Sequence, residues 1–139
     1  MRSKDKPLYA IRKMDSRTQE ITNRFQDSWK ETERIFGLFD NGGFERLKPV
    51  KKFIAELKEK GENNHFRIGT SLYRLIFSRS VERGLRDDQK YILIDTIAEK
   101  DYEVIFRDGF NKYREYRISD LNDERLTRLL KTLKNTVAD

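Results

Sequence analysis

The first part of the chain places its apolar residues at helical spacing. From Ile21 to Phe39 they recur every three or four positions, which is typical of the buried stripe of an amphipathic helix. Ser16 and Gln19 match a capping box, in which the serine hydroxyl accepts a hydrogen bond from the backbone N–H of Gln19. We expect a long helix that begins at Ser16 and ends at Asn41–Gly43, because glycine adopts the left-handed backbone of a helix terminus without strain.

A second amphipathic segment runs from Pro49 to Lys60. Proline suits the first turn of a helix because its missing N–H would have no intrahelical partner there, and Gly61 can end the helix. A short glycine-rich link joins the two segments, so we expect an antiparallel helical hairpin over residues 16–61. One face of its second helix carries Val50, Phe53, Ile54 and Leu57.

Three later segments have the pattern of strands. Residues 91–97 form a β-branched run, and residues 102–107 alternate, with their apolar members on one face. Asp108-Gly109 favours a tight turn, since both residue types tolerate a positive φ, and residues 112–118 provide the returning strand. The pattern predicts an antiparallel meander.

The segment Phe66–Val81 fits two structures. It could form a helix from Thr70 or a strand that extends the sheet, and periodicity alone does not decide between them for short apolar runs. We expect a strand, because Gly69 is unfavourable inside a helix and the neighbouring strands need a partner. One face of that strand would carry Arg67, Tyr73, Phe77 and Arg79.

The last segment has the clearest helical pattern. Asn122 can cap a helix over residues 122–138, with Leu121 and Leu126 in the positions of a hydrophobic staple. The acidic residues lie near its start and the lysines near its end, which suits the helix dipole. Its buried face would consist of Leu126, Leu129, Leu130, Leu133 and Val137.

These elements predict one α+β domain over residues 16–139. It consists of the N-terminal antiparallel helical hairpin, a three- to four-stranded antiparallel meander sheet over residues 66–118, and a C-terminal helix packed on the sheet. The chain of 139 residues, 36% hydrophobic and 39% charged, is of the size that usually forms a single core. Residues 1–15 precede this domain as a flexible basic arm.

The composition excludes several classes of protein. No apolar run is long enough to cross a bilayer, so we expect no membrane partner. The absence of cysteine excludes disulfides, thiolate catalysis and cysteine-ligated metals, and it fits a cytoplasmic protein. His65 is the only histidine, and the chain has neither a Gly-x-Ser-x-Gly motif nor a phosphate-binding glycine loop. We expect a protein that is not an enzyme and that uses no metal or cofactor.

The net charge of +6 is unevenly distributed. Residues 1–14 carry five basic residues against one acidic residue, and residues 66–90 carry six against three. Basic side chains that neutralise phosphates and aromatic rings that stack on bases together favour single-stranded nucleic acid. The candidate nucleic-acid-binding residues are Arg67, Tyr73, Arg74, Phe77, Arg79, Arg83, Arg86 and Lys90.

Two other interpretations stay open. Aromatic residues in strands are most often core, and the arginines after residue 80 lie beside acidic residues with which they can pair. The aromatic stripe of the first helix is either core or an interface for a second copy or a protein partner. That stripe consists of Phe25, Trp29, Phe36 and Phe39.

The expected function is therefore a non-enzymatic binding module for single-stranded DNA or RNA, with a protein-interaction or self-assembling module as the alternative. The order of four strands followed by a helix over residues 66–139 resembles the repeat unit of Whirly-type and Pur-alpha-type single-strand binders. That resemblance rests on topology without a shared motif. The preceding helical hairpin departs from it.

Overall fold

The computed structural model describes residues 8–38, 45–82, 88–109 and 111–139, and their side chains except those of residues 8–15, 112 and 113. The longer helices are α1 (Leu8–Gly37), α2 (Lys48–Glu59) and α3 (Glu124–Lys134). The strands are β1 (Arg67–Ser71), β2 (Arg74–Ser78), β3 (Lys90–Ala98), β4 (Asp101–Asp108) and β5 (Asn111–Ile118). Two short 3₁₀ helices, η2 (Glu45–Leu47) and η3 (Glu62–Asn64), flank α2.

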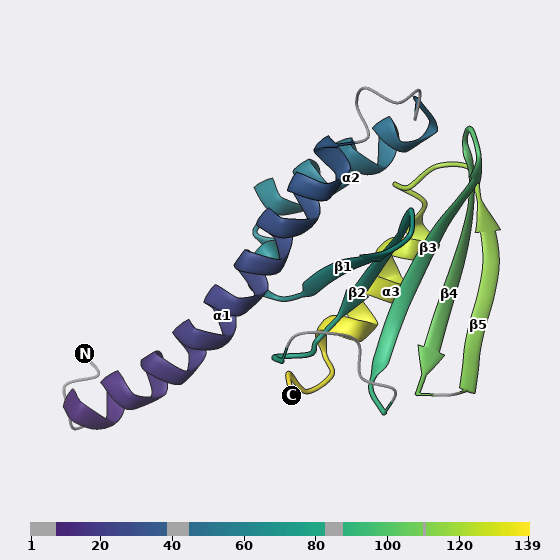
Figure 1. Cartoon of the computed structure of the whole chain (residues 1–139). Helices are drawn as coiled ribbons and strands as arrows, with labels where there is room; N and C mark the ends of the chain where they lie inside the picture. The colour runs from purple at the N-terminus through teal and green to yellow at the C-terminus, as the bar shows by residue number, and fades with distance from the viewer. Residues whose placement is uncertain (1–7, 39–44, 83–87, 110) are drawn as a thin grey trace.

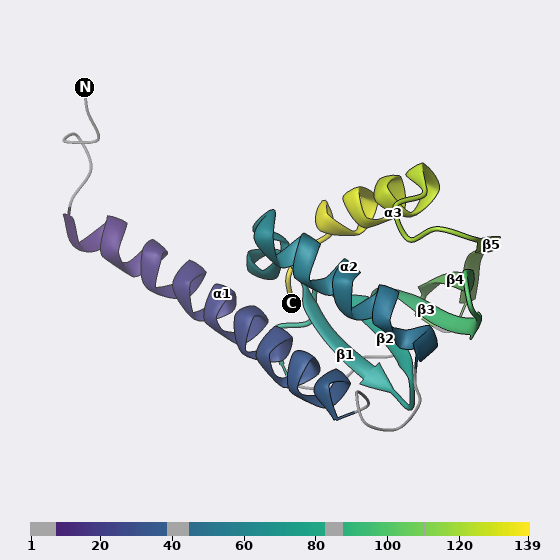
Figure 2. The same ribbon diagram turned by 90° about the horizontal axis from the view of Figure 1, so that it is seen from above.

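The strands form one antiparallel sheet in the order β1-β2-β3-β4-β5, so each strand pairs with its neighbours in sequence. Helices α2 and α3 cover the same side of this sheet, as Figures 1 and 2 show from two directions. Helix α1 runs antiparallel to α2 and lies along the β1 edge, and its N-terminal part extends beyond the sheet. Within the described part of the chain, no helix lies across the other side of the sheet.

The core lies between the sheet and the helices. Alternate residues of β3 and β4 face it, which explains why the residues of β4 alternate in the sequence. Three aromatic side chains meet the ring of Phe77 edge-on, with centroids 5.8 to 6.3 Å away, a favourable arrangement for aromatic pairs. They belong to Trp29, Phe53 and Phe66, one from α1, one from α2 and one from the segment before β1.

The sheet has five strands, not three or four. The segment that was expected to form one strand is a hairpin, because the chain reverses at Leu72 and Tyr73 and pairs Ser71 with Arg74. Leu72 has a φ of +58°, a conformation that turns usually assign to glycine or asparagine. The sequence therefore carries no ordinary turn signal at this position.

The boundaries of the two outer helices differ from the sequence prediction. Helix α1 already begins at Leu8, so Ser16 lies inside it and the predicted capping box is wrong. The helix ends at Gly37, before the predicted end at Asn41–Gly43, which itself lies outside the described residues. Asp123, not Asn122, caps α3, where its carboxylate accepts a hydrogen bond from the backbone N–H of Arg125. Val137 lies beyond α3 and is 81% exposed, so it does not belong to the core.

The second helix and the meander agree with the sequence pattern. Helix α2 ends one residue before Lys60, and Gly61 follows with a φ of +85°, the left-handed conformation that ends many helices. The four apolar residues expected on its inner face are all buried. The turn residue Gly109 likewise has a positive φ, of 63°.

Candidate binding surfaces

The hairpin changes which residues of β1 and β2 share a face. Cross-strand partners lie on the same side of a sheet, and the register pairs Arg67 with Ser78 and Ile68 with Phe77. Arg67 and Phe77 therefore lie on opposite sides, because the two-residue turn shifts the alternation by one position. Phe77 is 0% exposed in the core, so it is not available to stack on a base.

Arg67 and Arg79 bind backbone carbonyls of the protein itself. Arg67 donates to the carbonyls of Ser80 and Val81 at 2.8 and 2.7 Å. Arg79 donates from Nε to the carbonyl of Thr136 at 3.1 Å, and its Nη1 donates to the carbonyl of His65. Burial lowers the pKa of the Arg79 guanidinium. Both side chains hold parts of the fold together, which was not visible from the sequence.

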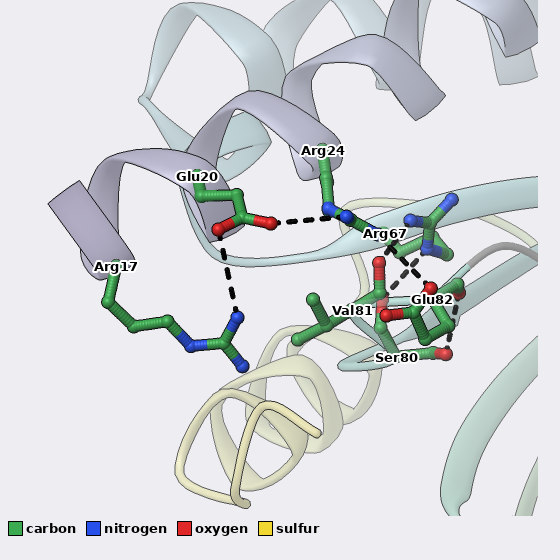
Figure 3. Close-up of polar contacts among 7 residues, drawn as sticks. All are labelled: Arg17, Glu20, Arg24, Arg67, Ser80, Val81 and Glu82. Carbon is green, nitrogen blue, oxygen red and sulfur yellow. Dashed lines mark hydrogen bonds and ion pairs between the residues drawn. The ribbon is translucent and has the colours of Figure 1, made fainter.

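The segment after β2 is tied to α1 by a chain of charged side chains (Figure 3). Arg24 donates to Glu20 on its own helix and to Glu82, with both distances 3.1 Å. Arg17 approaches the same Glu20 at 4.0 Å. The Ser80 hydroxyl donates to the carbonyl of Glu82. These contacts place the segment, together with Arg67, beside the helix.

The other predicted nucleic-acid residues do not form one cluster. Tyr73 is 39% exposed at the hairpin turn, where the guanidinium of Arg46 lies 6.0 Å from its ring centre. Arg74 pairs with Asp95 at 3.4 Å, and Lys90 is exposed at the start of β3. Arg83 and Arg86 lie outside the described residues. The predicted stacking platform is therefore wrong for Phe77, Arg67 and Arg79. Nucleic-acid binding itself stays a prediction.

The aromatic stripe of α1 belongs to the core. Phe25, Trp29 and Phe36 are 1%, 0% and 0% exposed, and the indole Nε1 of Trp29 donates to the carbonyl of Phe66 at 2.8 Å. These three side chains cannot form an interface without unfolding, so the proposed interface on this helix is wrong for them. Phe39 lies outside the described residues.

We call the uncovered side of the sheet the open face. The strand register arranges its side chains in three rows that cross the strands. The middle row is Gly69, Ile76, Leu93, Ile105 and Glu115. The first flanking row is Ser71, Arg74, Asp95, Glu103 and Arg117. The second flanking row is Arg67, Ser78, Tyr91 and Arg107.

The open face is almost neutral and has an apolar centre. Among the described side chains, its three rows carry four arginines against three acidic residues, and Asp101 at the end of β4 pairs with Arg117 at 2.8 Å. Ile76, Leu93 and Ile105 are direct cross-strand neighbours, and each is half-buried. This face is therefore not the basic surface that the sequence suggested.

A groove of about 570 Å³ lies where the open face meets α1. Gly69 and Ile76 line it from the sheet, and Asp27, Thr32 and Ile35 line it from α1. Apart from Gly69 and its two chain neighbours, no atom of the described residues lies within 4 Å of the place that a Cβ on Gly69 would occupy, so there is open space above it. Helix α1 thus forms a wall at the β1 edge of the open face.

The opposite side of the sheet is covered by α2 and α3, whose exposed residues we call the helical layer. Helix α2 has four lysines against two glutamates, and α3 has two arginines and two lysines against one glutamate. These two helices together carry a net charge of +5, and four acidic residues outside them pair with their cations: Glu33, Glu45, Glu62 and Asp123. The sequence contained this signal, because half of the positions of α2 outside its apolar stripe are lysine.

Several cations of the helical layer are not neutralised. Lys48, Lys58, Arg125 and Lys134 each pair with an acidic residue. In contrast, Lys52, Arg128 and Lys131 are exposed and make no ion pair within the described part of the chain.

The described residues contain no group of three or more metal-ligating side chains close enough to hold an ion. None of the described helices is long and apolar enough to span a membrane. No family model, curated protein or solved structure matches the chain. The topological resemblance to single-strand binders therefore has no support from known structures, and any function has to be inferred from the surfaces described above.

Proposed function

We propose that the protein is a non-enzymatic module that binds nucleic acid through phosphate contacts to the helical layer. The observation that carries this proposal is the difference in available cations: Lys52, Arg128 and Lys131 of α2 and α3 make no ion pair within the described residues, whereas the open-face residues Arg67, Arg74 and Arg117 all have protein partners. A cationic surface on one side releases counterions from a phosphate backbone when it binds, and this release drives association.

The spacing of the cations on α3 supports contacts along a backbone. Arg125, Arg128 and Lys131 recur every third residue, so neighbours are about 4.5 Å apart along the helix axis and share one side of it. Arg128 and Lys131 are unpaired within the described residues, and so is Lys52 on α2. Unpaired cations lose no protein partner when they bind phosphate.

The helical layer has no aromatic side chain that could stack on bases. The only aromatic residue of α2 and α3 is Phe53, which is buried. Binding through phosphates alone carries no direct sequence information. We therefore expect binding with little sequence preference, to duplex as well as single-stranded nucleic acid, in place of the stacking mode that the sequence suggested.

A salt titration of binding tests this proposal. The probe is a fluorescent oligonucleotide of mixed sequence, used single-stranded and as a duplex, and the variant is Arg128→Glu with Lys131→Glu. The matched control, Arg17→Glu with Lys30→Glu, makes the same charge change at exposed positions of α1. Wild-type affinity should fall linearly on a log–log plot against salt, and the variant should lower that slope on duplex by about 2.

The expected result is a loss of roughly tenfold or more in affinity at low salt for the α3 variant, with the α1 control close to the wild type. Two outcomes would overturn the proposal. The first is that no binding occurs even at low salt. The second is an equal loss in both variants, which would mean that total charge, and not the helical layer, determines binding.

A further inference from the structure

We infer that the open face is a self-association surface, which packs face to face against the open face of a second copy of this chain. The inference is independent of nucleic-acid binding, because it concerns the opposite side of the sheet. It rests on three properties of the open face: its apolar middle row, the symmetry of its charges, and its area.

The middle row gives the open face an apolar centre with a polar rim. Ile76, Leu93 and Ile105 lie side by side on β2, β3 and β4, and charged rows flank them on both sides. Interfaces between proteins commonly combine a central apolar patch with a polar surround. The solvated face of an antiparallel sheet is usually polar, and contiguous apolar patches on a surface often mark interaction sites, so three adjacent aliphatic residues favour a partner.

Two copies of the open face, related by a two-fold axis, would bring complementary residues together. A two-fold axis along β3 would place β2 of one copy over β4 of the other and keep each row over the same row. Ile76 would then meet Ile105, and Leu93 would meet Leu93 of the second copy. In the first flanking row, Arg74 of each copy would lie over Glu103 of the other, so the dimer would contain this contact twice.

The two carboxylates of this row, Glu103 and Asp95, are compatible with this arrangement. Glu103 lies beside its cross-strand partner Arg117 but makes no ion pair within the described residues, so its carboxylate is also accessible to Arg74 of the other copy. Asp95 would lie near the two-fold axis, beside Asp95 of the second copy. Arg74 already pairs with Asp95 of the same chain at 3.4 Å and offsets its charge. The wall formed by α1 beyond β1 would lie past the β5 edge of the second copy, so the two walls would not collide.

The area sets the expected strength. Five strands of five to nine residues spaced about 4.8 Å apart offer a face of roughly 500 Å² per copy. Two copies would bury roughly 1,000 Å², which is the lower end of the range for specific interfaces. We therefore expect a weak dimer, with a dissociation constant roughly in the micromolar range.

Sedimentation over a range of roughly 1 to 500 μM protein, without nucleic acid, tests the inference. The wild-type mass should rise with concentration from 16.7 kDa toward twice that value. Leu93→Asp should stay monomeric, because it buries a charge at the centre of the apolar row. The matched control is Val137→Asp, which makes the same kind of change at an 81% exposed position and should associate like the wild type. Circular dichroism verifies that both variants fold.

A charge exchange tests the orientation. Arg74→Glu and Glu103→Arg should each weaken association, because each places like charges opposite one another, and the double variant should recover it. A wild type that stays monomeric at every concentration, or a Leu93→Asp variant that associates normally, would overturn the inference. So would a double variant that associates no better than the single ones. The sedimentation experiment contains no nucleic acid, so its result does not depend on nucleic-acid binding. A failed binding assay therefore counts against the proposed function alone, and a failed sedimentation test counts against this inference alone.

Discussion

The two sides of the sheet take alternate residues of the same strands, yet they differ in how far their apolar side chains leave water. On the covered side Ile92, Val104 and Phe106 are 0%, 0% and 1% exposed. Their neighbours on the open face, Leu93 and Ile105, are only half-buried. The strands thus offer two apolar surfaces, and the helices determine which of them becomes the core.

Truncating two adjacent residues of β2 that face opposite sides should give the largest difference in stability. Phe77→Ala should lower the free energy of unfolding by about 3 to 5 kcal/mol, because it removes the ring at the centre of the aromatic cluster and leaves a cavity. Ile76→Ala removes a half-buried side chain and should cost about 1 kcal/mol. Urea unfolding at low protein concentration measures both values, and similar losses would contradict the difference between the two sides.

The sequence predicted those parts of the fold in which the spacing of the apolar residues matches the residues that are buried. Helix α2 has four apolar residues on one face and all of them are buried, and β4 alternates in burial along its length. The hairpin of β1 and β2 was not predictable, because its turn contains Leu72 with a φ of +58° in place of a turn-forming residue. One missed turn was enough to assign Phe77 to the wrong side of the sheet.

The candidate site was harder to predict than the fold, because the role of an arginine depends on distant partners. Arg79 binds the carbonyls of His65 and Thr136, and no local pattern connects these positions. Arg74, five residues earlier, makes only a surface ion pair. In the sequence the two arginines look alike, and only the folded chain separates a structural cation from an accessible one.

That distinction predicts a second, smaller difference in stability. Arg79→Met keeps much of the aliphatic stem but leaves two carbonyls without their donor, so it should cost about 1 to 3 kcal/mol. Arg74→Met removes an exposed ion pair and should cost at most about 1 kcal/mol. Urea unfolding compares the totals, and hydrogen exchange should rise near Asp139 in the Arg79 variant, since the backbone of Asp139 pairs with Arg79 and Val81. Unchanged exchange there would contradict the anchoring role of Arg79.

The smallest expected effect concerns two carboxylates, one on each side of the sheet, and the stabilisation that each loses as the pH falls. Hydrogen bonds from the Arg125 side chain lower the pKa of Asp123, and a hydrogen bond from Arg117 lowers the pKa of Asp101. Carboxyl groups with a lowered pKa stabilise the fold above the unfolded value, about 3.9, and lose that contribution as the pH falls through the folded value. Only Asp123 caps a helix, so only its protonation should unwind the start of α3.

Asparagine separates these roles, because it caps helices about as well as aspartate but does not titrate. Asp123→Asn should therefore keep its helical circular dichroism to a lower pH than the wild type, whereas Asp101→Asn should leave the acid loss of helical signal unchanged. An acid titration of both variants between about pH 5 and pH 2 measures this difference. If Asp101→Asn shifted the helical signal as much as Asp123→Asn, the open face and the helical layer would unfold as one unit in acid.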